Sequence, residues 1–327
     1  MSGYCRNLLI GLDGFDPELA EKWMASGDLP NLKRLAATGY YSPLKSTIPP
    51  FTYPAWSTLI TGENPGVHGM IDFAVRSPGE TDDNGVTTSP GSYDVQYINS
   101  RFRQCPTIFQ LASEAGMRVC AMGFPTTYPP EPVNGIMISG FDSPLAVSAD
   151  KSFCYPQEIW DELRDKVNPY TLAGIQELNT GGHWHRKAAP RILNTIQQRT
   201  DIAEYLLNKE SWDLFAVVFS ESDTAAHHFW AAHDERSPRN SAFKSQYGDE
   251  LNRFLKTVYI ELDKAVGRLT TNADHVMIVS DHGSGGTGCT RLSINRALHK
   301  HGYYSFREKD ESNSTMDQVY RVLPVKK

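Results

Sequence analysis

Short apolar runs alternate with longer segments of helical spacing along this 327-residue chain. Residues 8–13, 214–219 and 275–280 form the clearest runs, and two more lie at 117–122 and 135–140. Short runs that are apolar throughout are typical of strands buried on both faces of a parallel sheet. Because helical segments separate them, the pattern predicts an α/β fold, with a doubly wound, mostly parallel sheet sandwiched by helices.

Turn and capping residues mark the expected helices. Asp16-Pro17 is typical of a helix N-cap followed by a first-turn proline, and Gly39 of a helix end. Residues 74–104 are polar and without a convincing period, which indicates a surface excursion. Residues 142–185 are irregular and aromatic, as expected of a cap over the sheet edge. The expected helices span residues 17–26, 30–38, 52–61, 106–115, 188–208, 248–268 and 293–301.

Charge and cysteine content limit the classes of function. The chain has 32 basic and 38 acidic side chains and no basic block, which argues against binding to a nucleic-acid polymer. No apolar run reaches the roughly 18 residues of a membrane span, and the amino terminus lacks the apolar core of a secretory signal. The five cysteines are scattered and show no CxxC spacing, so we expect reduced thiols and a cytoplasmic location.

Carboxylates follow three of the predicted strands. Asp13 ends the first, Asp223 comes shortly after the fourth and Asp281 ends the last. Ligands gather beyond the carboxyl ends of the strands in an open α/β sheet, so we expect these side chains at one edge. They would repel one another unless a cation held them. His227 and His282 accompany two of them, and carboxylate oxygen with imidazole nitrogen suits zinc or a similar divalent metal.

Each of these motifs also has an ordinary structural interpretation. Taken alone, Asp13-Gly14 is a common turn, and Asp281-His282 belongs to a glycine-rich loop. The four-residue spacing of Asp223 and His227 merely places two side chains on one helical face. His228 is the competing ligand, but it does not share that face, so we expect it to pack or cap. Only the three motifs together favour a metal site over these alternatives.

Thr52 is the candidate nucleophile. Pro54 suits a first helical turn, so the Thr52 hydroxyl should lie at a helix N-terminus, which attracts phosphate groups. A threonine hydroxyl needs a metal or a base to react at neutral pH, and two metals about 4 Å apart would provide this activation. The alternative is that Thr52 is a simple helix N-cap.

Four motifs occur in order between residue 8 and about 302. The first is Leu12-Asp13-Gly14, and the second is the segment TYPAWSTLITGENPGVHG that starts at Thr52. The third is DTAAH, from Asp223 to His227, and the fourth is Ser280-Asp281-His282-Gly283. Together they resemble the metal-ligand and nucleophile motifs of the type I phosphodiesterase/nucleotide pyrophosphatase family, which belongs to the alkaline phosphatase superfamily.

The resemblance implies an alkaline-phosphatase-like α/β core with two divalent metals, usually zinc, with manganese as the alternative. Thr52 would form a covalent phospho-threonine intermediate that water then releases, and the substrate would be a small phosphoester. By carry-over, one metal would be held by Asp13, Thr52, Asp281 and His282, and the other by Asp223 and His227.

Two departures from the family pattern affect these expectations. The nucleotide pyrophosphatase branch has an asparagine three residues after the nucleophile, where this chain has Ala55. The family also supplies a further histidine to the second metal from downstream, and the only histidines after His282 are His299 and His301. We therefore expect one catalytic domain over residues 1–327 that is C-terminally incomplete, and a weak second metal site.

The favoured interpretation is a cytoplasmic, metal-dependent phosphohydrolase or phosphodiesterase. Alternatives on the same centre are a phosphonate hydrolase or a phosphosugar mutase-type phosphoryl transfer. A third is a catalytically weak truncated member that binds one metal. The fourth is a dinucleotide-binding oxidoreductase, since Gly283-x-Gly285-x-x-Gly288 follows a predicted strand and Glu308 lies about twenty residues further on.

Overall fold

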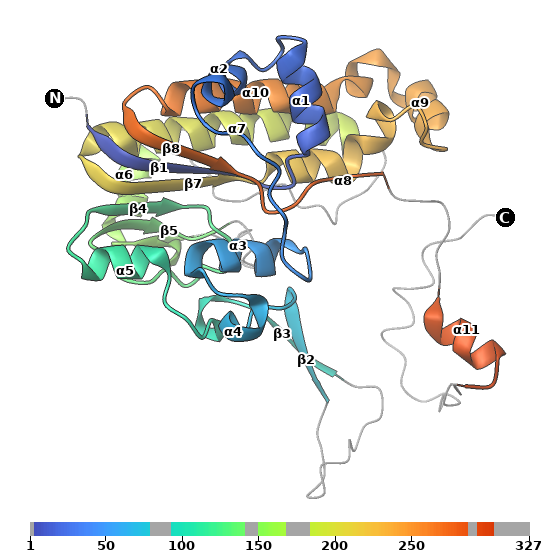
Figure 1. Ribbon diagram of the computed structural model, residues 1–327, viewed down its shortest axis with the longest axis horizontal. Helices are drawn as coiled ribbons and strands as arrows, with labels where there is room; N and C mark the ends of the chain where they lie inside the picture. The colour runs from blue at the N-terminus through green and yellow to red at the C-terminus, as the bar shows by residue number, and fades with distance from the viewer. Residues whose placement is uncertain (1–2, 79–92, 141–149, 168–183, 287–292, 304–327) are drawn as a thin grey trace, which may run out of the picture. The chain divides into compact units, whose positions relative to one another are not determined.

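The computed structural model describes residues 3–78, 93–140, 150–167, 184–286 and 293–303 (Figure 1). The chain divides into two compact units, Met1–Gly286 and Thr287–Lys327. The first unit carries the sheet and all the candidate site residues. Within the second, the described residues form one short helix, α11 (Ile294–Lys300).

A six-stranded sheet forms the centre of the first unit, in the order β6-β5-β4-β7-β1-β8. All neighbouring pairs are parallel except β5 and β6. The neighbouring strands β7 and β1 pair segments that lie more than 200 residues apart in the sequence, which agrees with the predicted doubly wound sheet. The strands are β1 (Cys5–Leu12), β4 (Val119–Met122), β5 (Gly135–Ile138), β6 (Cys154–Tyr155), β7 (Trp212–Phe219) and β8 (Ala273–Val279).

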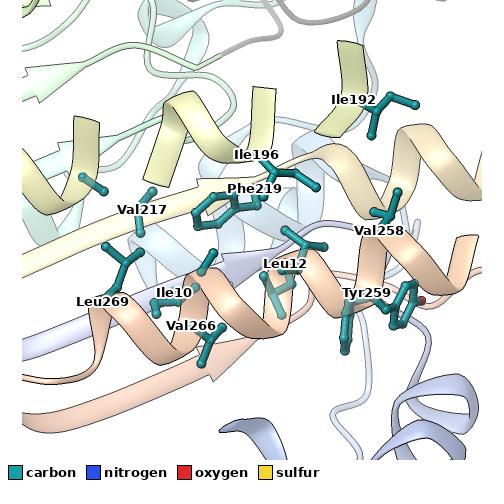
Figure 2. Packing of buried hydrophobic residues seen from close by; sticks show 14 of the residues in the cluster. Ile10, Leu12, Ile192, Ile196, Val217, Phe219, Val258, Tyr259, Val266 and Leu269 are labelled. Atoms are coloured by element: carbon teal, nitrogen blue, oxygen red, sulfur yellow. The ribbon is translucent and has the colours of Figure 1, made fainter. Parts of the chain in front are cut away.

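Alternate residues of β7 face two separate hydrophobic clusters. Val217 and Phe219 belong to the larger cluster, with side chains of α7 (Trp184–Lys209) and α10 (Phe254–Leu269) (Figure 2). Ala216 and Val218 belong to the other, with α3 (Thr52–Thr61) and α5 (Ile108–Glu114). From Phe215 to Phe219 both faces of β7 are buried, which explains why this part of the strand is apolar at every position and does not alternate. The remaining helices are α1 (Pro17–Ala25), α2 (Pro30–Thr38), α4 (Pro65–His68), α6 (Glu158–Lys166), α8 (Glu221–His233) and α9 (Asn240–Asn252).

Two segments contain more regular structure than the sequence indicated. The surface excursion forms an antiparallel ribbon of β2 (Ala74–Pro78) and β3 (Tyr93–Tyr97). Val75 and Tyr97 are both exposed, so the ribbon lacks the alternation that would have marked it. The cap-like segment contains β6 and α6, so the prediction of an irregular chain was wrong there. Residues 79–92, 141–149 and 168–183 lie outside the described part.

Helix α8 was not predicted as an element, although the spacing of Asp223 and His227 assumed a helix there. Its sequence, ESDTAAHHFWAAH, is rich in alanine and histidine and has no clear apolar stripe. None of the described helices is both long enough and apolar enough to cross a bilayer.

Candidate metal centre

The carboxyl ends of β1, β7 and β8 bring three predicted ligands together. Asp13 directly follows β1, and its backbone N–H still bonds to Phe219 of β7 at 2.8 Å. Asp223 lies in the first turn of α8, just after β7, and His282 lies just after β8. Ligand atoms of Asp13, Asp223 and His282 all lie within 4.8 Å of one another. One sheet edge thus collects two carboxylates and an imidazole, as expected for an open α/β sheet.

Buried acidic side chains are concentrated at this edge. Asp13 is 1% exposed, and the His282 Nε2 atom lies 3.6 Å from its Oδ1 and 3.3 Å from Asp281 Oδ2. Burial, and then the neighbouring Asp281 and Asp223 carboxylates, raise the pKa of Asp13 well above its usual range. Burial also raises the pKa of Asp281 to about 6, against the opposing effect of His282. Without a metal, ionisation of these carboxylates is therefore unfavourable. A bound cation would stabilise their ionised forms.

Carboxylate oxygen atoms without a hydrogen-bond partner also indicate a metal site. Within the described part of the chain, Asp13 Oδ1 and Asp281 Oδ2 are buried without a hydrogen-bond partner. The other oxygen of each carboxylate is bonded, Asp13 Oδ2 by Trp56 and Asp281 Oδ1 by the Gly14 amide. Buried polar atoms are rarely left unbonded, so an unbonded oxygen on each carboxylate fits a metal ligand. The donor set of oxygen and imidazole nitrogen fits zinc or a similar divalent ion.

His282 is oriented by its own loop. Its Nδ1 atom lies 2.8 Å from the Gly283 carbonyl oxygen, which can only accept a hydrogen bond. The Nδ1 position therefore carries a proton, and Nε2 faces the carboxylates, from where its lone pair could bind a metal. The same Nε2 atom lies 3.3 Å from Thr52 Oγ1. The structure thus brings the predicted nucleophile to the predicted ligands.

Thr52 does not act as a helix cap. Helix α3 begins at Thr52, and its N-cap is Phe51, in an extended conformation and without a side-chain capping bond. The hydroxyl is thus on the first helical residue and faces His282, so the N-cap alternative was wrong. The first-turn N–H groups of a helix have no intrahelical acceptor, and they favour phosphate oxygens.

Asp223 and His227 are more open. Their side chains are 20% and 61% exposed, and His227 Nε2 lies 3.3 Å from Asp223 Oδ2. Gly14, at φ 60°, lets the chain after Asp13 pass close by, since a Cβ atom there would lie 2.6 Å from Asp223 Oδ1. His228 instead packs against Trp184, with ring centroids 4.1 Å apart, and burial lowers its pKa to about 4.

Serine hydroxyls that the sequence analysis did not identify tie the loops of the centre together. Each donates to a backbone carbonyl beside a predicted ligand, and Ser280 also accepts from the Phe15 amide at 2.9 Å. Such outer contacts orient ligands before any metal binds. The bonds run from Ser222 to Asp13, from Ser280 to His282, from Ser284 to Gly14 and from Ser46 to Asp281, over 2.5 to 2.7 Å.

Two further sequence predictions concern the region after β8. The described residues 282–286 contain no helix, so no helix opens directly on the first glycines of the possible dinucleotide fingerprint. Residues 287–292 and Glu308 lie outside the described part. His299 and His301 belong to the second compact unit, which is described only by itself. Weak metal binding at the site of Asp223 and His227 therefore stays a prediction.

The fold and the ligand motifs define an alkaline-phosphatase-like protein. Residues 7–326 match the family model described as type I phosphodiesterase / nucleotide pyrophosphatase. The chain therefore belongs to this family of the alkaline phosphatase superfamily, as its motifs predicted.

Comparison with solved structures agrees on the fold. Crystal structures of phosphonoacetate hydrolase from Sinorhizobium meliloti 1021, in complex with phosphonoformate or phosphonoacetate, match with TM-scores of 0.56 and 0.55. Both are 16% identical, and each match covers 92% of this chain. This chain matches only 63% of the length of those proteins. Comparison with curated proteins gives no significant match.

Proposed function

We propose that the protein is a metal-dependent phosphohydrolase of small phosphoesters, with Thr52 as the nucleophile. The observation that carries this proposal is the 3.3 Å distance from Thr52 Oγ1 to His282 Nε2, within a cluster of buried carboxylates. In the proposal, one metal is held by Asp13, Thr52, Asp281 and His282, and a second by Asp223 and His227. Family membership supports this assignment, since each residue stands in a matching motif.

The chain's own residues define the proposed reaction. The metals would supply positive charge that favours the threonine alkoxide and stabilises the charge developing on the phosphoryl group. Thr52 Oγ gives up its proton to solvent and forms a bond to phosphorus, and the ester oxygen leaves with the bonding electrons and takes a proton from solvent. A water oxygen then loses a proton and bonds to phosphorus, Thr52 Oγ leaves with the bonding electrons and takes up a proton, and phosphate, or a monoester when the substrate is a diester, is released. The N-terminus of α3 lies beside the phosphoryl oxygens throughout.

The proposal includes zinc as the bound metal and the cytoplasm as the location of the protein. Zinc is favoured because the set of carboxylate oxygen and imidazole nitrogen matches its usual ligands. The described cysteines support a reducing compartment, because Cys5, Cys105, Cys120 and Cys154 are all free thiols.

Phosphonate hydrolysis is the second candidate. It is favoured by the likeness of the fold to phosphonoacetate hydrolase and by Ala55, where the nucleotide pyrophosphatase branch has an asparagine. In that reaction the phosphorus–carbon bond would break, and the leaving carbon would take a proton. Phosphate release from phosphonoacetate, compared with product release from chromogenic mono- and diesters, distinguishes the two substrate classes.

Substitution of Thr52 tests the shared mechanism. Thr52→Ala should remove the phosphoryl-enzyme trapped by acid quench and lower kcat by roughly a thousandfold or more. Metal content should stay near wild type, because five carboxylate or imidazole ligands remain. Thr52→Ser keeps the hydroxyl and should keep part of the activity.

Thr61→Ala is the matched control. It removes the same hydroxyl from the other end of α3, where that hydroxyl donates to the Ser57 carbonyl and accepts from the Glu63 amide. Its kcat should equal that of the wild type. An active Thr52→Ala variant that still forms a phosphoryl-enzyme would overturn the assignment of the nucleophile.

A further inference from the structure

A tryptophan on the nucleophile helix contacts the metal-site carboxylate directly. Trp56 is 0% exposed, and its indole Nε1–H donates to Asp13 Oδ2 at 3.0 Å. We infer that Trp56 is a positioning residue that turns the Asp13 carboxylate so that its other oxygen faces the metal. This inference rests on the proposed function, because it assigns Asp13 to a metal.

The two oxygens of Asp13 have clearly different surroundings. The indole holds Oδ2, whereas Oδ1 has no hydrogen-bond partner within the described residues and lies 3.6 Å from His282 Nε2. A carboxylate can rotate about its terminal torsion, which is broad and roughly two-fold. A donor fixed on one oxygen removes that freedom and leaves the second oxygen directed at the centre.

The indole itself has little room to move. A Cβ atom on Gly11 of β1 would lie 2.4 Å from Cη2 of Trp56, so the ring occupies space that only glycine leaves open. On another side the ring meets Phe124 edge-on, with centroids 5.8 Å apart. Strand β1 therefore carries, at Gly11, the gap that admits the indole, and the predicted ligand Asp13 directly follows the strand two residues later.

An indole suits this task chemically. Its N–H donates and cannot accept, so it does not compete with Asp13 for the metal. It is also neutral, so it orients the carboxylate without cancelling the negative charge that attracts a cation. An arginine or lysine there would form a stronger bond to Asp13 but would repel the metal.

The position of Trp56 on α3 ties the carboxylate to the nucleophile. Trp56 follows Thr52 by four residues, so the two side chains lie on the same face of α3, one turn apart. The hydroxyl that attacks and the donor that orients Asp13 thus belong to one rigid element. Movement of α3 would displace the candidate nucleophile and the donor to Asp13 together.

The experiment separates this hydrogen bond from simple core packing. Trp56→Phe keeps an aromatic ring and removes the donor. Trp56→Gln loses the ring, but its Nε2 donor is separated from Cβ by as many bonds as the indole Nε1. The measurements are zinc affinity by competition with a chelating dye and thermal unfolding of the metal-free protein. Phe124→Leu is the control, since it disturbs the same packing contact and leaves the donor in place.

We expect zinc affinity and thermal stability to rank Trp56→Phe and Trp56→Gln in opposite order. Trp56→Phe should bind zinc about 10–100-fold more weakly than wild type, the usual cost of losing a partner that orients a ligand. Trp56→Gln should unfold at a lower temperature than Trp56→Phe and yet bind zinc more tightly. Phe124→Leu should unfold earlier than wild type with unchanged zinc affinity.

The failure of this inference is distinguishable from that of the proposed function. Equal zinc affinity of wild type and Trp56→Phe, or zinc affinities that follow thermal stability in all three variants, would overturn the role of Trp56 alone. Asp13→Asn serves as the reference for the metal site. If wild type binds no divalent metal, or if Asp13→Asn binds as well as wild type, both proposals are wrong.

Discussion

The two halves of the candidate centre are held by different means. The Asp13 half, with Thr52, Asp281 and His282, comes from loops at the ends of β1 and β8 and from the start of α3. The Asp223 half, with His227, comes from a single helix, α8. The Asp13 side chain is 1% exposed, and that of His227 is 61% exposed.

This difference is one of preorganisation. In the Asp13 half, each carboxylate has one oxygen bonded and one left over, and the His282 ring is fixed through Nδ1. In the Asp223 half, the backbone is anchored, because Glu221 beside it pairs with the buried Arg199 at 3.3 Å, but the His227 ring faces solvent. Ligands held before binding lose less conformational entropy when the metal arrives. The Asp13 half should therefore bind metal more tightly.

The largest expected effect comes from removing one histidine from each half. His282→Asn should abolish tight zinc binding and lower kcat by roughly a thousandfold or more, because the ligand is inside the preorganised half. His227→Asn should leave the tight site within about tenfold of wild type, since its side chain is largely in water. Zinc titration by calorimetry and kcat on a chromogenic phosphoester measure both.

The control is His275→Asn, which removes an exposed histidine from β8 and should change neither quantity. The comparison of the two halves fails if His282→Asn and His227→Asn weaken the tight site equally. It is reversed if His227→Asn is the more damaging substitution.

The pH dependence of the metal-free protein sharpens the comparison further. The pKa of Asp281 is raised to about 6 and that of Asp13 well above its usual range, mainly by burial, so the folded state favours their neutral forms. Their contribution to stability is complete below about pH 4 and is lost as the pH rises through 6 and above. Asp281→Asn, which stays neutral, should lose about 1–3 kcal/mol less stability than wild type between pH 5 and 8.

Urea unfolding in the presence of a chelator at the two pH values measures this difference. Saturating zinc should reverse the sign, since metal binding requires the ionised carboxylates, and the holoprotein should be more stable at pH 8 than at pH 5. If the stability of wild type and of Asp281→Asn changes identically with pH in the absence of metal, ionisation of the Asp281 carboxyl does not destabilise the fold.

The sequence was sufficient to predict that Asp13, Asp223 and His282 lie close together, because each comes at or shortly after the end of a recognisable strand. Asp13 and Asp281 end runs that are rich in apolar residues, and parallel strands place their carboxyl ends together whatever the details of packing. Helix α9 and the ribbon of β2 and β3 were missed because local patterns do not specify them.

The supporting contacts could not be predicted in the same way. The bond from Ser222 to the Asp13 carbonyl joins residues 209 positions apart and depends on the register in which β1 pairs with β7. Trp56 lies four residues after the candidate nucleophile Thr52, but nothing at Gly11 indicated that an indole fills the space beside it. Such contacts follow from the packed structure and not from local sequence.

The smallest expected effect concerns the contact that joins the two halves. Ser222 is fully buried beside Asp223, and its hydroxyl donates to the Asp13 carbonyl at 2.5 Å. Ser222→Ala should cost about 1 kcal/mol of stability, the typical net contribution of one hydrogen bond. If this bond sets the spacing of the halves, kcat should also fall by about fivefold, because each 1.4 kcal/mol corresponds to a factor of ten.

Ser237→Ala, on the loop after α8, is the control and should change neither stability nor kcat. A loss of stability with unchanged kcat would mean that the halves are positioned independently, the Asp13 half by the sheet and the Asp223 half by α8.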